Sequence, residues 1–232
     1  MKTHEIHNRI HGYESNVLRH NITDGLWNKP AHILSVLSHE MAKPENERLH
    51  WLFWVDADTI LLNPSIPIEL FLPPSPELDD IHLVILNDQN KLNNGVFPIR
   101  VNQWSVDLFT AVVNFRRDRP DAALQSNDQS AMDILLQQPQ FLRHTVFVRD
   151  QRWFNAWYFG SNETLREKET RPGEFIMHFA AVRRRERHMT TWLDRVERNH
   201  TDWDVKPKHT RYPAELARFW KQKHRFRSIS QM

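Results

Sequence analysis

Residues 49–64, LHWLFWVDADTILLNP, contain the feature that decides the fold. Residues 51–55 form an unbroken run of aromatic and aliphatic side chains, which is typical of a strand buried inside a sheet. Two aspartates one residue apart, Asp56 and Asp58, follow this run directly. Burying an ionised carboxylate without a partner costs several kcal/mol, so the pair needs a compensating charge. A divalent cation supplies that charge at the carboxyl end of the strand, where open α/β sheets place their ligands.

The same aspartates allow two other interpretations. In the first, Asp56 and Asp58 only cap a turn after the strand, a common use of Asp. The second is a phosphatase of the haloacid-dehalogenase type, in which a hydrophobic strand leads to Asp-x-Asp and the first Asp is a nucleophile. Those phosphatases usually carry Thr or Val two residues after the second Asp, where this chain has Ile60. The aromatic strand before the pair and Asn63-Pro64 after it favour the metal site.

Length and composition indicate a single globular α/β domain. The chain has 232 residues, of which 40% are hydrophobic and 26% are charged, enough to build a substantial core. Its net charge is +2, but basic residues outnumber acidic ones roughly two to one from Arg183 onward. No recognisable nucleic-acid-binding module accompanies this basic region, so we expect no nucleic-acid partner. An anionic small substrate or a solvated basic face accounts for the charge better.

The compartment is only weakly constrained by the sequence. There are no cysteines, which excludes disulfides and thiolate zinc sites. N-glycosylation sequons begin at Asn21, Asn162 and Asn199, and they permit a secretory-pathway lumen without requiring it. No signal peptide or apolar membrane span is recognisable in the 232 residues.

The rest of the chain predicts helices that alternate with strands. Helices are expected at residues 3–11, 28–41, 104–115, 128–136, 186–199 and 213–223, and strands at 13–18, 51–55, 81–86, 96–100, 145–148 and 174–179. Gly12 is a natural left-handed end for the first helix, and Asn94-Gly95 predicts a tight turn. Pro98 marks its segment as an edge strand or a bulge. Such alternation favours a mostly parallel sheet with right-handed crossovers.

Polar residues fall at the expected carboxyl ends of these strands. They are Asp56, Asp58, Asn87, Asp88 and His178. Two aspartates and an imidazole suit Mn²⁺ and leave coordination positions for a diphosphate. A lone histidine at the third position is more commonly a core residue with one satisfied nitrogen, so the aspartates carry this prediction.

The order of the motifs provides a more specific indication. The chain resembles the fungal and plant α-galactosyl-, α-mannosyl- and xylosyltransferase family, glycosyltransferase family 34, from about residue 8 to about residue 182. No single piece is diagnostic, but six in the right order at compatible spacing are highly specific. The matching pieces are WLFWVDAD (51–58), NGVFPIR (94–100), QWSVDL (103–108), DQSA (128–131), QRWFN (151–155) and FIMHF (175–179).

The resemblance implies a GT-A-type nucleotide-diphospho-sugar transferase fold with a mostly parallel central sheet, formed by one domain over residues 1–232 with a basic helical region from about 183 to 232. It implies transfer of a hexose or pentose, with retention of configuration, from a UDP- or GDP-linked sugar to a glycan hydroxyl. Mn²⁺ or another divalent cation would be the cofactor. The family also implies the lumenal side of the Golgi membrane and assembly with other glycosyltransferases.

Site residues carry over by position from the family. Asp56, Asp58 and His178 resemble the metal ligands. Gln129 is similar to the residue beneath the anomeric carbon, and Asp128 to one that holds the donor sugar. Without the family, both are ordinary residues of a first helical turn.

Four further positions match donor-binding residues of the family. Asn94 and Gly95 would let the backbone approach the donor, or they form a turn without a function. Arg183 matches a basic residue for the diphosphate, or belongs to a solvated run with Arg184 and Arg185. Lys29 and Trp27 form a Trp-x-Lys pattern that the family has near the donor. Without a role in donor binding, Lys29 would be a surface residue and Trp27 a core residue.

The chain also departs from the family pattern. Pro98 and Val101 replace residues that are more often Leu and Asn, and Ala181 stands where Gly is usual. The membrane anchor, the stem and the first strand with its base-binding loop are missing, so we expect an N-terminally incomplete version of a longer chain. An open sheet without its central first strand would expose unpaired backbone groups. The alternative function is an inactive remnant that binds carbohydrate or a partner.

Overall fold

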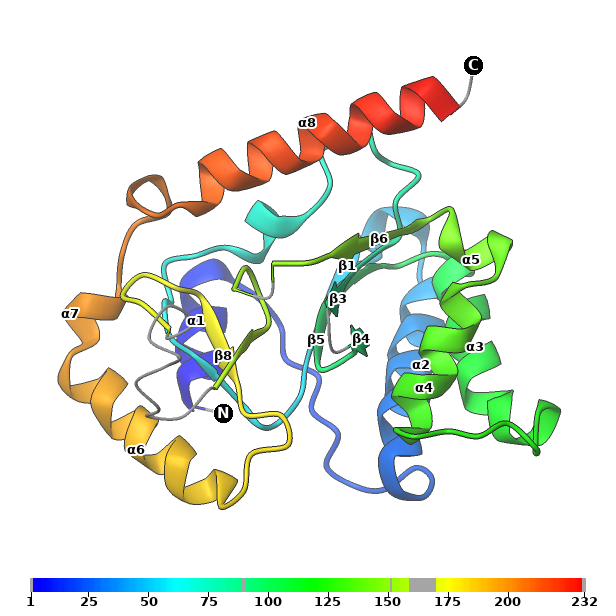
Figure 1. Ribbon diagram of the computed structural model, residues 1–232, viewed down its shortest axis with the longest axis horizontal. Helices are drawn as coiled ribbons and strands as arrows, with labels where there is room; N and C mark the ends of the chain where they lie inside the picture. Colours follow the sequence, from blue (N-terminus) through cyan, green and yellow to red (C-terminus); the bar gives the residue numbers. More distant parts are fainter. Residues whose placement is uncertain (1, 89–90, 151, 159–169, 231–232) are drawn as a thin grey trace. The chain divides into compact units, whose positions relative to one another are not determined.

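The computed structural model describes residues 2–88, 91–150, 152–158 and 170–230 (Figure 1). Gln151 and the sequon at Asn162 lie outside the described residues. The chain divides into two compact units. Unit 1 consists of Met1–Ser15, Val55–Asp79 and Asp150–Met232, and unit 2 of Asn16–Trp54 and Asp80–Arg149. Among the described residues, no helix combines the length and apolar character that crossing a membrane requires.

The main sheet belongs to unit 2 and has the order β1-β5-β3-β4, with β6 also pairing with β3. Its strands are β1 (Trp51–Val55), β3 (Leu83–Asp88), β4 (Lys91–Asn93), β5 (Val96–Arg100) and β6 (Thr145–Val148). β3 is parallel to β6 and antiparallel to β4 and β5. The expected mostly parallel sheet is therefore not confirmed, and the described pairings are mixed. Only two residues separate β3 from β4, and so short a connection produces an antiparallel neighbour.

Asn94 and Gly95 form a bulge rather than the predicted tight turn. Leu83 lies opposite Ile99 and Leu86 opposite Asn93, so three steps along β3 face six steps along the partner segment. Because β6 occupies the other edge of β3, β4 and β5 run end to end along the same edge. Gly95 N donates to Asn93 Oδ1 over 2.9 Å, which stabilises the irregular backbone.

Four helices of unit 2 pack with this sheet. They are α2 (Asn28–Met41), α3 (Gln103–Asp118), α4 (Asn127–Leu136) and α5 (Pro139–Leu142), with 3-10 helices at Gly25–Trp27 and Glu45–Glu47. α2, α3 and α4 lie together on one side of the sheet (Figure 1). Leu83 and Ile85, two residues apart on β3, face the same core as Leu108 and Val112 of α3. The predicted alternation of strand and helix periodicity thus produces one continuous apolar core.

Unit 1 contains a smaller three-stranded sheet. Its strands, in the order β2-β8-β7, are β2 (Thr59–Leu61), β8 (Ile176–His178) and β7 (Ala156–Trp157). β8 is antiparallel to β2 and parallel to β7. Strands of two or three residues carry too short a pattern to be predicted, and β2 and β7 were not expected.

Several helices lie in the described part of unit 1. They are α1 (Lys2–His11), α6 (Arg185–Arg198), α7 (His200–Trp203) and α8 (Tyr212–Ser230), with 3-10 helices at Ile68–Phe71 and Pro207–His209. Ile60 and Met177 face one another across β2 and β8 and pack with Trp203 of α7. α1 ends where predicted, with Gly12 at a φ of +73°.

Of the helices and strands predicted from the sequence, one is absent from the structure. The expected strand at residues 13–18 is irregular in the structure. Tyr13 instead packs its ring against His7 and His11 of the preceding helix. Pro98 lies in β5, which has β1 on one side and β3 on the other, so the edge-strand interpretation of this proline is wrong. The expectation of one domain over residues 1–232 stays a prediction.

Candidate functional site

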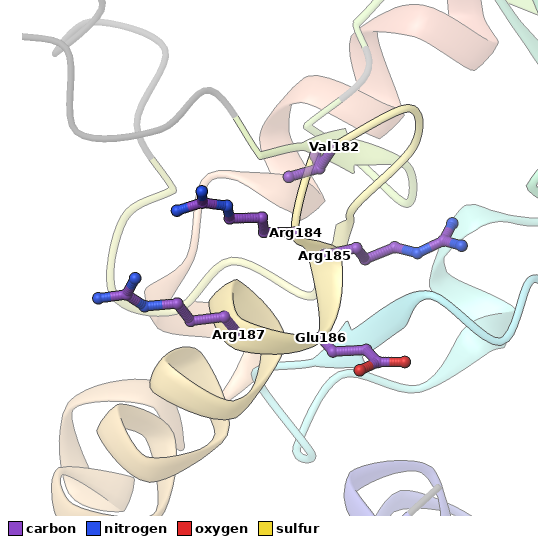
Figure 2. Close-up of a pocket in the computed structure, with 5 residues that line it drawn as sticks. All are labelled: Val182, Arg184, Arg185, Glu186 and Arg187. Carbon is purple, nitrogen blue, oxygen red and sulfur yellow. The ribbon is translucent and has the colours of Figure 1, made fainter.

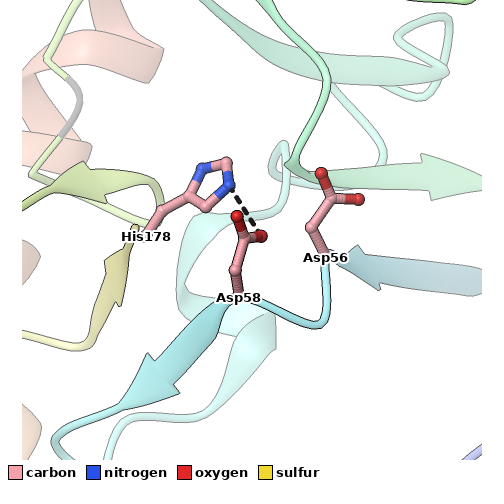
Figure 3. A group of neighbouring side chains, drawn as sticks. All are labelled: Asp56, Asp58 and His178. Carbon is pink, nitrogen blue, oxygen red and sulfur yellow. Dashed lines mark ion pairs between the residues drawn. The ribbon is translucent and has the colours of Figure 1, made fainter. Parts of the chain in front are cut away.

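Three of the predicted site residues meet at the edge of the small sheet of unit 1 (Figure 3). Asp56 and Asp58 lie in the turn between β1 and β2, where Thr59 Oγ1 donates to the carbonyl of Asp56 over 2.8 Å. β8 is antiparallel to β2 and places His178 opposite Thr59. Phe179 N then donates to the carbonyl of Asp58 over 2.9 Å. Backbone pairing therefore brings together side chains that are more than a hundred residues apart in sequence.

The ligand atoms of Asp56, Asp58 and His178 all lie within 4.8 Å of one another. Nε2 of His178 is 3.2 Å from Oδ1 of Asp58, and the imidazole is 3% exposed. Arg185 forms an ion pair with the other carboxylate oxygen of Asp58. Burial raises the pKa of Asp58, but the hydrogen bond and charge of His178 and the charge of Arg185 outweigh burial and lower it to about 2. Asp58 is therefore an anion at neutral pH.

This donor set fits a divalent metal ion. Two carboxylates and one imidazole offer hard oxygen and borderline nitrogen ligands, a combination that suits Mn²⁺ and related ions. The cluster also leaves coordination positions for further oxygen ligands, because three protein groups do not complete an octahedral shell. The arrangement agrees with the metal ligands predicted from the sequence.

The sequence did not predict the second hydrogen-bond partner of His178, which is Asn155. Nδ1 of His178 lies 2.9 Å from Oδ1 of Asn155, a residue that is 1% exposed. Asn155 belongs to the QRWFN segment, yet nothing in that pattern indicates which buried group an asparagine will contact.

Arginines after β8 line a cavity of about 560 Å³ in unit 1 (Figure 2). Its lining residues are Val182, Arg184, Arg185, Glu186 and Arg187. Arg184 and Arg187 extend to one side of the chain, and Arg185 extends to the other. The segment begins with unusual backbone, because Ala181 and Arg184 have φ values of +56° and +54°. Non-glycine residues with positive φ are uncommon and accumulate at functional sites.

Arg183, which the family resemblance predicts to bind the diphosphate, is exposed and is not among the residues that line this cavity. The run of three consecutive arginines was a visible signal for a basic loop. Which of its members would face the cavity depends on the left-handed backbone at Arg184, which re-aims the following side chains. The run of arginines does not predict a left-handed backbone at Arg184.

The other predicted residues gather in unit 2. Asn94 Nδ2 donates to Asp128 Oδ2 over 2.9 Å, and Lys29 Nζ donates to Asn94 Oδ1 over 2.9 Å. Lys29 Nζ is also 3.6 Å from Asp128 Oδ2. Gln129 Oε1 accepts from Asn94 N at 3.3 Å. These four residues form a connected polar network, which we call the Lys29 network.

Three local features build the Lys29 network. The bulge at Asn94-Gly95 turns the Asn94 side chain and amide out of the regular ladder. Asp128 and Gln129 occupy the first turn of α4, where an acidic side chain is favoured by the helix dipole. Asn94 and Asp128 are 4% and 3% exposed, so their hydrogen bonds are shielded from water. A network of this kind offers donors and acceptors that a sugar hydroxyl can use.

Asn87 and Asp88, which the sequence placed at the end of a strand near the metal, belong to unit 2. Their backbones pair with Leu92 and Lys91 of β4. A short β3–β4 connection keeps this strand end within the sheet, where a crossover had been expected.

Comparison with solved structures identifies the fold. The chain is similar, with a TM-score of 0.56, to the crystal structure of a glycosyltransferase involved in the glycosylation of the major capsid of PBCV-1. The match covers 82% of this chain and 89% of the other at 17% sequence identity, so it shows the fold alone. The fold is that of a GT-A-type nucleotide-diphospho-sugar transferase, as the resemblance implied.

Sequence comparison identifies the family. Residues 75–189, about half of the chain, match the sequence model of the galactosyl transferase GMA12/MNN10 family, and the chain belongs to this family. It is similar to Xyloglucan 6-xylosyltransferase 4 of Arabidopsis thaliana, with 26% identity over 213 residues covering 75% of this chain. It is also similar to Galactomannan galactosyltransferase 1 of Cyamopsis tetragonoloba, with 27% identity over 202 residues covering 76% of this chain. The chain spans 39% and 45% of the lengths of these two relatives.

Proposed function

We propose that this protein is a metal-dependent retaining glycosyltransferase. It would move a hexose or pentose from a UDP- or GDP-linked sugar to a hydroxyl of a glycan acceptor. The observation that carries the proposal is the Asp56–Asp58–His178 cluster in a chain of this family and fold. Relatives named for xylosyl and galactosyl transfer support both sugar classes and do not separate them.

Asp56, Asp58 and His178 would hold the divalent cation, with Mn²⁺ the ion that best suits the donor set. When bound, the cation supplies Lewis-acid stabilisation of the negative charge that grows on a departing diphosphate. The protein's own contribution is an anionic Asp58 and an imidazole held in the sheet, which keep the ligands in position before the donor arrives.

The Lys29 network would bind the donor sugar. Asp128 is held by Asn94 and by the charge of Lys29, so its carboxylate oxygens are fixed as acceptors for sugar hydroxyls. Gly95 lies in the bulge, where the absence of a side chain lets a ligand approach the backbone closely. Gln129 would stabilise charge that develops at the anomeric carbon, because an amide is a poor nucleophile but a good dipole.

Arg183 would add positive charge toward the diphosphate, together with the arginines that line the nearby cavity in unit 1. A planar guanidinium matches phosphate oxygens in a bidentate manner. The protein would act on the lumenal side of the Golgi membrane, as expected for this family, with other glycosyltransferases and without nucleic acid.

A nucleotide-sugar hydrolysis assay tests the proposal against the alternative of an inactive binding remnant. We expect slow hydrolysis of one UDP- or GDP-sugar that requires Mn²⁺ and stops on chelation. A thermal-shift screen of UDP- and GDP-linked galactose, mannose and xylose selects the donor first. Binding of a donor without hydrolysis under any metal condition would favour the remnant, and cleavage of a phosphomonoester would favour the phosphatase interpretation.

A further inference from the structure

Asn155 contacts the imidazole of His178 from the side opposite to the carboxylates. Its Oδ1 lies 2.9 Å from Nδ1 of His178, whereas Nε2 of the same ring lies 3.2 Å from Oδ1 of Asp58. The two ring nitrogens therefore have different partners. Asn155 and His178 are 1% and 3% exposed, so water does not compete for the bond between them.

The pairing of two short strands fixes this contact. β7 runs parallel to β8, with Trp157 in register with His178. Asn155 immediately precedes β7, so the pairing of β7 with β8 brings it beside His178, 23 positions later in the sequence.

The oxygen of an amide can only accept a hydrogen bond, so Nδ1 of His178 must donate to Asn155. A neutral imidazole carries a single N–H, and with the hydrogen on Nδ1 the lone pair lies on Nε2. A histidine that ligates a metal through one nitrogen usually donates its other N–H to a fixed acceptor, which sets both tautomer and ring orientation. Nε2 is the nitrogen on the side of Asp58.

We propose that Asn155 is a positioning residue that accepts a hydrogen bond from Nδ1 of His178, leaves Nε2 to ligate the metal and thereby prepares the metal cluster. This inference rests on the proposed function of Asp56, Asp58 and His178 as metal ligands. Asn155 acts through His178 and contacts neither the metal nor the substrate.

The first experiment measures whether Nδ1 of His178 carries a hydrogen in the wild-type protein without added metal. Long-range ¹H–¹⁵N correlation spectra of ¹⁵N-histidine-labelled protein distinguish Nδ1–H from Nε2–H rings, and loss of one ring system in His178→Gln assigns His178 among the 14 histidines. We expect a hydrogen on Nδ1, because Oδ1 of Asn155 can only accept a hydrogen bond. A His178 ring whose Nδ1 carries no hydrogen in the folded wild-type protein would overturn the inference without any substitution in Asn155.

The second experiment titrates Mn²⁺ by calorimetry in the presence of UDP and, separately, of GDP. Removing an outer hydrogen-bond partner of a ligand typically costs 10- to 100-fold in metal affinity, so we expect losses of about that size in Asn155→Ala and Asn155→Leu. Asn155→Asp keeps an acceptor at the same place and should restore affinity to within about threefold of the wild type. It should also keep the hydrogen on Nδ1 of His178.

Asn63 provides a matched structural control. It is completely buried in unit 1 and donates to the carbonyls of Gly173 and Val205 over 3.0 and 2.9 Å, away from the metal cluster. Asn63→Ala should lower the melting temperature yet leave the Mn²⁺ affinity of the folded protein unchanged. Wild-type affinity in Asn155→Leu would refute the role of Asn155 alone, whereas a wild-type protein that binds no Mn²⁺ with either nucleotide would refute the metal centre itself.

Discussion

Asn94 Nδ2 donates a hydrogen bond of 2.9 Å to Asp128 Oδ2, which joins the bulge between β4 and β5 to the first turn of α4. Both residues are almost completely buried. A buried carboxylate that loses a charge-assisted hydrogen bond retains its desolvation cost, so this single contact matters for stability as well as for the shape of the Lys29 network.

Asn94→Ala should lower the free energy of unfolding by about 1–3 kcal/mol, because Asp128 is left with fewer partners in a buried position. Urea denaturation should show an earlier midpoint with an unchanged slope. Gln140→Ala, which removes only an exposed hydrogen bond in unit 2, should change stability by less than about 0.5 kcal/mol. Equal losses of stability in the two variants would contradict a stabilising role for the hydrogen bond between Asn94 and Asp128.

Asp58→Asn and His178→Ala should abolish Mn²⁺-dependent binding of UDP or GDP without unfolding the chain. Each substitution removes one of three ligands, and Asp58→Asn also removes the anion that pairs with Arg185. Calorimetry measures the affinity, and circular dichroism checks the fold. Asp194→Asn, on the exposed face of α6, is the charge-matched control and should bind as the wild type does. Unchanged affinity in either cluster variant excludes the metal centre as described.

Gln129→Glu should keep donor binding but change the rate of turnover. If Gln129 stabilises charge at the anomeric carbon, its replacement alters the transition state more than the ground state. Donor affinity is measured by thermal shift, and turnover by release of nucleoside diphosphate. Intact-mass analysis of the wild-type protein with donor should show no glycosyl adduct. An adduct on Gln129 would show that this residue forms a covalent bond to the sugar and would contradict the proposed role.

Unit 1 should lose stability as the pH falls below about 6.5. Burial lowers the pKa of His4 on α1 to about 4, although its hydrogen bond to Thr59 acts in the other direction. The unfolded chain therefore takes up a proton at a higher pH than the folded chain does. The loss of stability grows as the pH falls from the ordinary histidine pKa of 6.5 toward the folded-state pKa of about 4. Between about pH 7.5 and pH 5 this amounts to about 1–2 kcal/mol.

His4→Gln should flatten this part of the pH dependence, because the substituted side chain can still donate to Thr59 but does not titrate in this range. Thermal melts at several pH values measure the effect. The exposed His39 on α2 is the matched control, and His39→Gln should leave the wild-type profile intact. A wild-type melting temperature that does not change over this range would show that His4 does not protonate on unfolding.

Ala181→Gly should stabilise the protein by about 1 kcal/mol. Ala181 has a φ of +56°, a conformation that costs an L-residue about 1–2 kcal/mol and costs glycine little. Ala217→Gly, in the middle of α8, should have the opposite sign and cost about 1 kcal/mol. Denaturant midpoints of the two variants measure the difference, and destabilisation by Ala181→Gly would show that the strain is relieved in another way.

Strain at Ala181 also explains a feature of the sequence. This alanine stands where glycine is usual in the family, and the sequence alone gives no reason for the departure. The left-handed backbone provides the cause, because glycine alone occupies that region without a steric cost.

Local sequence determined the features whose physics is local. Gly12 ends α1 because a left-handed residue caps a helix there, and Asn102 begins α3 by accepting a hydrogen bond from Ser105 N over 3.0 Å. The apolar run before Asp56 predicted β1, although its five residues are only half-buried. Asp56 and Asp58 predicted a metal site because two neighbouring carboxylates need a compensating positive charge, whatever the surrounding fold.

Tertiary structure decided the features that depend on which strands pair. Asn94-Gly95 has the composition of a tight turn, yet β3 accepts β4 and β5 along one edge and makes the same residues a bulge. The pairing of β2, β7 and β8 brings Asn155 and His178 to Asp58, and the left-handed turn at Arg184 selects the arginines that line the cavity. Register and backbone direction are set by hydrogen bonds between distant segments, and no local pattern of side chains encodes them.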